Sequence, residues 1–145
     1  MRAQRLAEAS ETTFVLVFDK GDDPIEGLTR FARDEQLGAA QFTGIGAFSE
    51  LVVGYFDRGR KDYSRIPIAE QVEVLSLAGD IALDADGEPQ VHAHVVVGKA
   101  DGSAHGGHLL EARVWPTLEL ILVEPPRALH KRLDPETGLA LISLP

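Results

Sequence analysis

The stretch VHAHVVVGKADGSAHGGHL, residues 91–109, decides the fold and holds four of the five histidines of the chain. Apolar residues alternate with other residues through its first half, and a period of two is typical of a β-strand with one buried face. The Asp101-Gly102 pair that follows is a strong signal for a tight hairpin turn. The segment after the turn is therefore expected to return as an antiparallel partner. On this pattern His92 and His94 share one face of the first strand, with Cα atoms about 6.5 Å apart.

The register of this hairpin decides whether His108 joins the other two histidines. A two-residue loop by itself would place His108 on the opposite side of the sheet. We expect a β-bulge at Gly106-Gly107, which adds one residue to the returning strand and brings His108 to the side of His94, on the diagonal. Diagonal neighbours lie about 7–8 Å apart, which is within reach of a shared ion.

Three imidazoles on one face predict a metal site with His92, His94 and His108 as ligands. Neutral imidazole nitrogens bind zinc at about 2.0–2.1 Å and also suit copper, iron or nickel; zinc is the ion we expect. The chain has no cysteine, so disulfides and thiolate metal sites are excluded. The alternative is that these histidines are polar residues of a solvated face, or buried side chains bonded to their neighbours. Both interpretations remain open on the sequence alone.

Two further residues are candidate ligands, or candidate hydrogen-bond partners of ligands. Glu119 is the acid within the apolar strand TLELIL, and its alternative role is an outward-facing carboxylate on an edge strand. His105 lies in the expected loop, whereas His130 is expected at the surface. No Ser-His-Asp order, P-loop or dinucleotide fingerprint occurs, so we assign no enzymatic activity. An ion with an open position would still be able to activate water.

The rest of the chain predicts an α+β domain with a mostly antiparallel sheet and one main helix. The helix is expected over about residues 23–37, with Asp23 as N-cap and Pro24 at the first helical position. The single domain is expected to span residues 1–145, with its core at about 12–144. Separate short strands are expected for the segments AAQFTGIGAF, SELVVGYFD, GGHLLEARV and PTLELILVE.

Several glycines are expected to have structural roles. Gly38 is expected to end the helix in a left-handed conformation. Gly44 and Gly46, in GIGAFSEL, lack the third glycine and the following helix of a phosphate-binding loop, and are expected to allow close strand approach or a bulge. The Arg-Gly-Arg tripeptide within DRGRKD is the core of a minor-groove AT-hook, but acids bracket it and the hook's proline is missing. A hairpin turn explains it better.

Composition limits the functional classes. The chain has 145 residues and a formal net charge of −9, and such an acidic surface gains little from counterion release on a phosphate backbone. DNA binding is therefore disfavoured. No apolar run approaches the roughly 20 residues of a membrane span, and the N-terminus is too charged for a signal peptide. A cytoplasmic protein without a membrane partner is the simplest expectation.

Taken together, FTGIGAFSELVVGYFD, VEVLSLAGDIAL, VHAHVVVGKADG, GGHL and TLELIL resemble the plant and prokaryote conserved (PPC) domain. The resemblance covers roughly residues 14–144. In plants this domain accompanies AT-hooks, and the resemblance implies that the present chain is a stand-alone prokaryotic member of the family. It implies an α+β fold and a homotrimeric assembly. It also implies a metal-compatible site at His92, His94 and His108. Prokaryotic members are often labelled as DNA-binding proteins, by association with the plant proteins.

Three functional hypotheses follow. The first is a trimeric domain that binds a metal or a small ligand through the three histidines. The second is a DNA-binding or transcription-associated regulator. The third is a protein–protein oligomerisation module whose histidines are structural. We rank the first slightly ahead, and the sequence names no physiological ligand or partner.

Overall fold

The alternating apolar residues of the strands build one sheet that curls around a single core. The computed structural model describes residues 1–8 and 11–144, and these residues form nine strands and one helix. The elements are β1 (Arg2–Glu8), β2 (Thr12–Phe18), α1 (Pro24–Asp34), β3 (Ala39–Asp57), β4 (Asp62–Ile68), β5 (Val72–Leu83), β6 (Pro89–Gly98), β7 (Ala104–Glu124), β8 (His130–Leu133) and β9 (Ala140–Ser143). Among the described residues, no helix is long and apolar enough to cross a bilayer.

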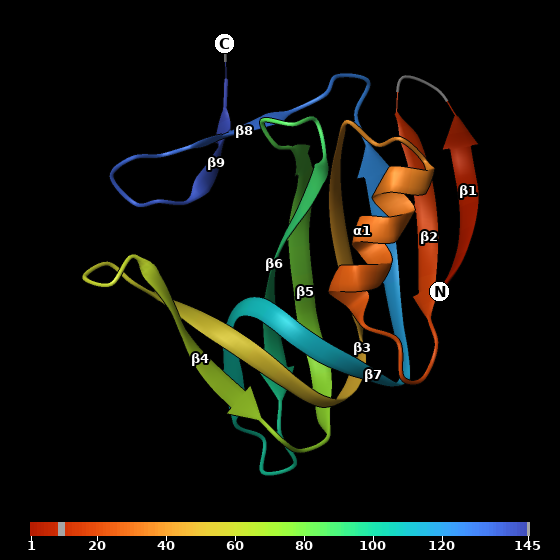
Figure 1. Ribbon diagram of the computed structural model, residues 1–145. Helices are drawn as coiled ribbons and strands as arrows, with labels where there is room; N and C mark the ends of the chain where they lie inside the picture. Colours follow the sequence, from red (N-terminus) through yellow and green to blue (C-terminus); the bar gives the residue numbers. More distant parts are fainter. Residues whose placement is uncertain (9–10, 145) are drawn as a thin grey trace.

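Two long strands, β3 and β7, hold the sheet together (Figure 1). They run antiparallel to each other, from the pair Gln41–Val123 to the pair Gly54–His108. The first half of β3 also pairs with β5, β5 pairs with β6, and β6 pairs with the start of β7. These four strands therefore form a closed circuit of ladders. Strand β2 pairs with the C-terminal part of β7, and β1 pairs with β2 at the edge of the sheet. Strand β4 pairs with the second half of β3.

Register shifts allow β3 to bend between its two sets of partners. The β3–β5 ladder shifts between Gly44 and Gly46, and the β3–β7 ladder shifts just beyond Gly46. A Cβ on Gly44 would lie 2.5 Å from the carbonyl oxygen of Glu119, and one on Gly46 would lie 2.7 Å from Leu118 Cα. Strand β7 therefore approaches β3 more closely here than a side chain would allow.

The helix covers one end of the core. The Asp23 side chain accepts hydrogen bonds from the backbone N–H groups of Ile25 and Glu26, as an N-cap should. The apolar face of α1 buries Leu28 and Phe31 against the sheet, and the Phe31 ring meets Phe14 edge to face at 5.1 Å.

The predicted fold class is confirmed: a single domain with one helix and a largely antiparallel sheet. The helix ends at Asp34, and the left-handed residue after it is Gln36 (φ 56°), so the role expected for Gly38 was wrong. The DRGRKD turn is confirmed between β3 and β4. The four short strands are in fact two continuous ones, β3 and β7, and strands β1 and β8 were not predicted.

Candidate metal centre

The hairpin of β6 and β7 sets the positions of the histidines. Its loop is formed by residues 100–102, closed by a 2.9 Å backbone hydrogen bond from Lys99 N–H to the Ser103 carbonyl. The last loop residue, Gly102, has φ 81°, the left-handed conformation typical of a three-residue hairpin loop. The loop is thus one residue longer than the sequence suggested.

This longer loop replaces the expected bulge. The register of β6 with β7 is unbroken through Gly106 and Gly107, so the prediction of a bulge there was wrong. The extra residue lies in the loop instead, and it changes the parity of the register in the same way. As a result His108 lies directly opposite His94 rather than on the diagonal.

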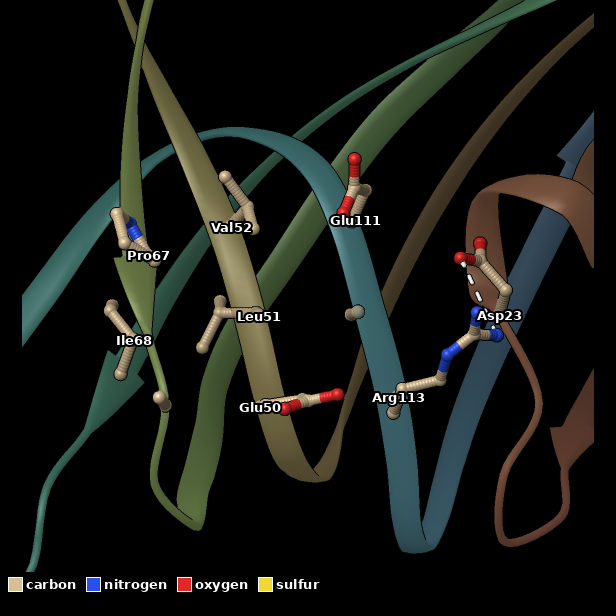
Figure 2. Close-up of a pocket in the computed structure, with 10 residues that line it drawn as sticks. Asp23, Glu50, Leu51, Val52, Pro67, Ile68, Glu111 and Arg113 are labelled. Carbon is tan, nitrogen blue, oxygen red and sulfur yellow. Dashed lines mark ion pairs between the residues drawn. The ribbon is translucent and has the colours of Figure 1, made fainter.

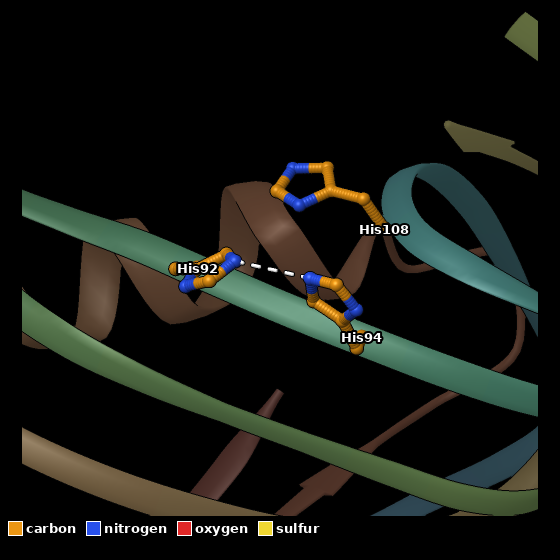
Figure 3. Close-up of side chains that lie close together, drawn as sticks. All are labelled: His92, His94 and His108. Carbon is orange, nitrogen blue, oxygen red and sulfur yellow. Dashed lines mark hydrogen bonds between the residues drawn. The ribbon is translucent and has the colours of Figure 1, made fainter. Parts of the chain in front are cut away.

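The three histidine rings converge on one space (Figure 3). The Nε2 atoms of His92 and His94 are 3.1 Å apart, and these ring centroids are 5.0 Å apart. The centroid of the His108 ring lies 5.2 Å from that of His92 and 5.4 Å from that of His94. One ligand nitrogen from each ring lies within 4.8 Å of the other two. The Nδ1 atom of His108 is buried and has no hydrogen-bond partner among the described residues.

An acid on β5 orients the first histidine. Asp80 lies opposite His92 in the β5–β6 ladder, and its Oδ2 is 3.1 Å from His92 Nδ1. A carboxylate oxygen can only accept, so Nδ1 donates, and in the neutral ring the lone pair is on Nε2. Carboxylate–histidine pairs of this kind orient metal ligands in many proteins. The other oxygen, Oδ1, lies 3.1 Å from the ammonium of Lys131, a buried residue of β8.

A tyrosine ring packs against the imidazole of His108, the third histidine of the cluster. Tyr63 of β4 stacks on His108, with ring centroids 4.6 Å apart and planes 27° apart. The space for this ring exists because Gly54, opposite His108 in the β3–β7 ladder, has no side chain. A Cβ there would lie 2.7 Å from Tyr63 Cδ1.

Burial keeps two of the imidazoles neutral. Burial, together with the nearby charges of His92, His94 and Lys131, lowers the pKa of His108 to about 4. Burial is also the largest cause of the lowered pKa of His94, with His92 adding to the effect and Asp80 opposing it. At neutral pH both rings present a free lone pair, which is the form that binds metal ions.

The other predicted site residues lie apart from this cluster. Glu119 is exposed on the outer side of β7, where it lines a hollow with Ile45 and Leu75, so the geometry does not support it as a fourth ligand or a partner of one. His105 is exposed, and its Nε2 lies 3.4 Å from Ser103 Oγ. His130 is exposed on β8.

Sequence reasoning missed Asp80, Lys131, Tyr63 and Gly54. Asp80 had a signal, since it is an acid inside the apolar run LAGDIAL, as Glu119 is in TLELIL. Only the register distinguishes the two acids, because it places Asp80 opposite His92, whereas Glu119 lies opposite Ile45 in the β3–β7 ladder.

A pocket that is separate from the histidine cluster lies between β3, β4 and β7 (Figure 2). It contains Glu50, Glu111 and Arg113, and Arg113 Nη1 is 3.9 Å from Asp23 Oδ2. It contains no histidine. Among the described residues, the histidine cluster is the group whose ligand atoms are close enough to share an ion.

Comparisons with known proteins identify a family and several similar structures. The family model of the Plants and Prokaryotes Conserved (PCC) domain matches residues 5–126. A plant- and prokaryote-conserved (PPC) protein of Pyrococcus horikoshii is 30% identical, with a TM-score of 0.85 over 99% of this chain and 95% of its own. The metal-containing protein of Archaeoglobus fulgidus is 34% identical, with a TM-score of 0.82 over 91% of this chain and 93% of its own. A Ralstonia eutropha JMP134 protein, called a candidate DNA-binding protein, is 34% identical, with a TM-score of 0.85 over 91% of each chain.

The curated relatives are much longer proteins. The bifunctional protein GlmU of Synechococcus sp. (strain JA-3-3Ab) is 31% identical over 140 residues, which cover 94% of this chain and 21% of that protein. The chain therefore spans about a fifth of the length of the curated relatives it matches.

Proposed function

This chain belongs to the Plants and Prokaryotes Conserved domain family, and we propose that it binds a divalent transition metal through His92, His94 and His108. Zinc is the ion that we propose first. We further propose that it acts as a homotrimer. The observation that carries the metal proposal is the convergence of the three rings around a buried His108 Nδ1 that has no partner among the described residues.

The donor set fits a zinc ion. At bond lengths of about 2.0–2.1 Å, two nitrogens bound to one tetrahedral ion lie about 3.3 Å apart. The Nε2 atoms of His92 and His94 are 3.1 Å apart, so a small movement would seat an ion between them. A zinc ion held by three imidazoles has a fourth position for water or a ligand. The name of the Archaeoglobus relative, a metal-containing protein, also supports the proposal.

Elemental analysis of untagged protein purified without added metal tests this proposal. We expect about one zinc ion per chain, and loss of that zinc in the His94→Ala variant. His105→Ala is the matched control, because His105 lies on the same hairpin outside the cluster, and it should keep its metal. If the wild-type protein contains no metal and takes up none from a zinc solution, the histidines form a hydrogen-bonded structural cluster and the proposal is wrong.

A further inference from the structure

A pocket of about 420 Å³ opens beside the histidine cluster. Its lining includes His92, His108 and Tyr63 of the cluster, and Asp80 and Lys131 beside it. The β8–β9 hairpin also lines the pocket, with apolar residues that include Leu141 and Ile142. This volume is at the small end of the range for pockets that bind small molecules.

The lining of the pocket includes a buried cation with a donor to spare. Lys131 is 6% exposed, and its ammonium lies 3.1 Å from Asp80 Oδ1 and 3.5 Å from the Gln90 carbonyl oxygen. An ammonium has three N–H donors, whereas the described residues give Lys131 one hydrogen bond, to the Gln90 carbonyl, and one ion pair, with Asp80. One donor is therefore available to a molecule in the pocket.

The charges around this pocket favour an anion. The positive charge of Lys131 and the negative charge of Asp80 offset each other. The three imidazoles are neutral ligands, so the double positive charge of a bound divalent ion is left uncompensated. An uncompensated charge beside an apolar wall is costly, and an anion would reduce that cost. A carboxylate suits both partners, since its oxygens bind zinc at about 2.0–2.2 Å and accept strong hydrogen bonds from an ammonium.

The geometry points to a binding site for a small carboxylic acid, with its carboxylate between the metal and Lys131 and its apolar body against the β8–β9 hairpin. This inference rests on the proposed metal function. The pocket should bind a monocarboxylate with a short hydrocarbon body more tightly than inorganic phosphate, because its lining offers a single lysine and several apolar residues.

Cobalt-loaded protein provides the test, because the visible absorption of Co²⁺ reports changes in its ligands. The protein is first loaded with Co²⁺ and its metal content measured. It is then titrated with isobutyrate, with the neutral isobutyramide of the same shape, and with inorganic phosphate. We expect a saturable spectral change with isobutyrate, no change with the amide, and much weaker binding of phosphate.

Two variants locate the site. Lys131→Met should bind isobutyrate about tenfold more weakly or worse, because one charged hydrogen bond is lost. Leu141→Glu places a negative charge at the pocket wall without touching Asp80 or the histidines, and it should also weaken binding. Its matched control is Leu133→Glu, the same change on the same hairpin at an exposed residue outside the pocket, which should bind like the wild type.

The outcomes separate the two proposals. If Co²⁺ binds but isobutyrate gives no spectral change, the carboxylate site is wrong and the metal site stands. If Co²⁺ does not bind, the metal proposal fails and this inference fails with it. Equal binding of phosphate, or unchanged isobutyrate binding by both Lys131→Met and Leu141→Glu, would also overturn the carboxylate site.

Discussion

At the scale of the residue, Asp80 is predicted to set the metal affinity of the cluster. Its carboxylate orients His92 and makes the free ring nitrogen of that imidazole a stronger electron-pair donor to a metal ion. Asp80→Asn should weaken zinc binding roughly 10–100-fold, as measured by competition with a chromophoric chelator.

Glu119→Gln is the control for this prediction, because it makes the same chemical change in the acid that the sequence also suggested. Glu119 lines a different hollow, so its amide variant should bind zinc like the wild type. Equal affinities for the Asp80→Asn variant and the wild type would contradict the role of Asp80.

The three histidines could be predicted from the sequence, but their surroundings could not. Strand alternation places His92 and His94 on one face whatever the rest of the fold is. The position of His108 depends on a loop one residue longer than expected, and the prediction placed that extra residue at a bulge instead. Lys131 reaches the site from a strand about 40 positions away along the chain, and no local pattern encodes such a contact.

At the scale of the element, the start of α1 depends on its cap. Asp23→Ala removes the acceptor for two backbone N–H groups and should lower the free energy of unfolding by about 1 kcal/mol, measured by urea denaturation. Asp23→Asn keeps an acceptor and loses the 3.9 Å ion pair with Arg113 (Figure 2), whose side chain is 54% exposed, so the change should lower the free energy of unfolding by a few tenths of a kcal/mol at most. If Asp23→Asn and Asp23→Ala lower the free energy of unfolding by the same amount, the cap is not the stabilising contact.

The elements themselves were predicted best where local signals suffice. Asp23 and Pro24 identify the start of the helix because capping is local chemistry. The division of β3 and β7 into shorter strands was wrong because turn-like residues in them, such as Gly46 and Pro116, lie within strands that bend and continue. A bend in a long strand and a break between two strands have similar residue patterns, and long-range pairing decides between them.

At the scale of the molecule, the charge argues against DNA as a partner. The chain carries 23 acidic and 14 basic side chains, a net charge of −9, and binding to DNA would bring this charge against a phosphate backbone. We expect no change in the fluorescence anisotropy of a labelled DNA duplex at about 50 mM salt, where electrostatic binding is strongest. Saturable binding that weakens as salt rises would contradict this expectation and favour the regulator hypothesis.

The outer face of the sheet supports the proposed trimer. Ile45, Leu75 and Ile121 are 45–63% exposed, and together with Glu119 they line one hollow of about 430 Å³ across β3, β5 and β7. Apolar side chains gathered in this way are typical of a surface that is covered in an assembly. In a cyclic trimer each copy contributes two different surfaces, so damage to one of them breaks all three contacts.

Sedimentation therefore tests both the assembly and its surface. The wild-type protein should have a mass of about 47 kDa, three times that of the 15.7 kDa chain. Leu75→Glu should reduce the mass to that of one chain, because it replaces an apolar contact with a second carboxylate beside Glu119, and neither charge would have a cationic partner in the hollow. Leu133→Glu, the same change at a residue of β8 that is 72% exposed, should leave the trimer intact. A wild-type mass of one chain would exclude the trimer, whereas an intact trimer in Leu75→Glu would place the contact on another face.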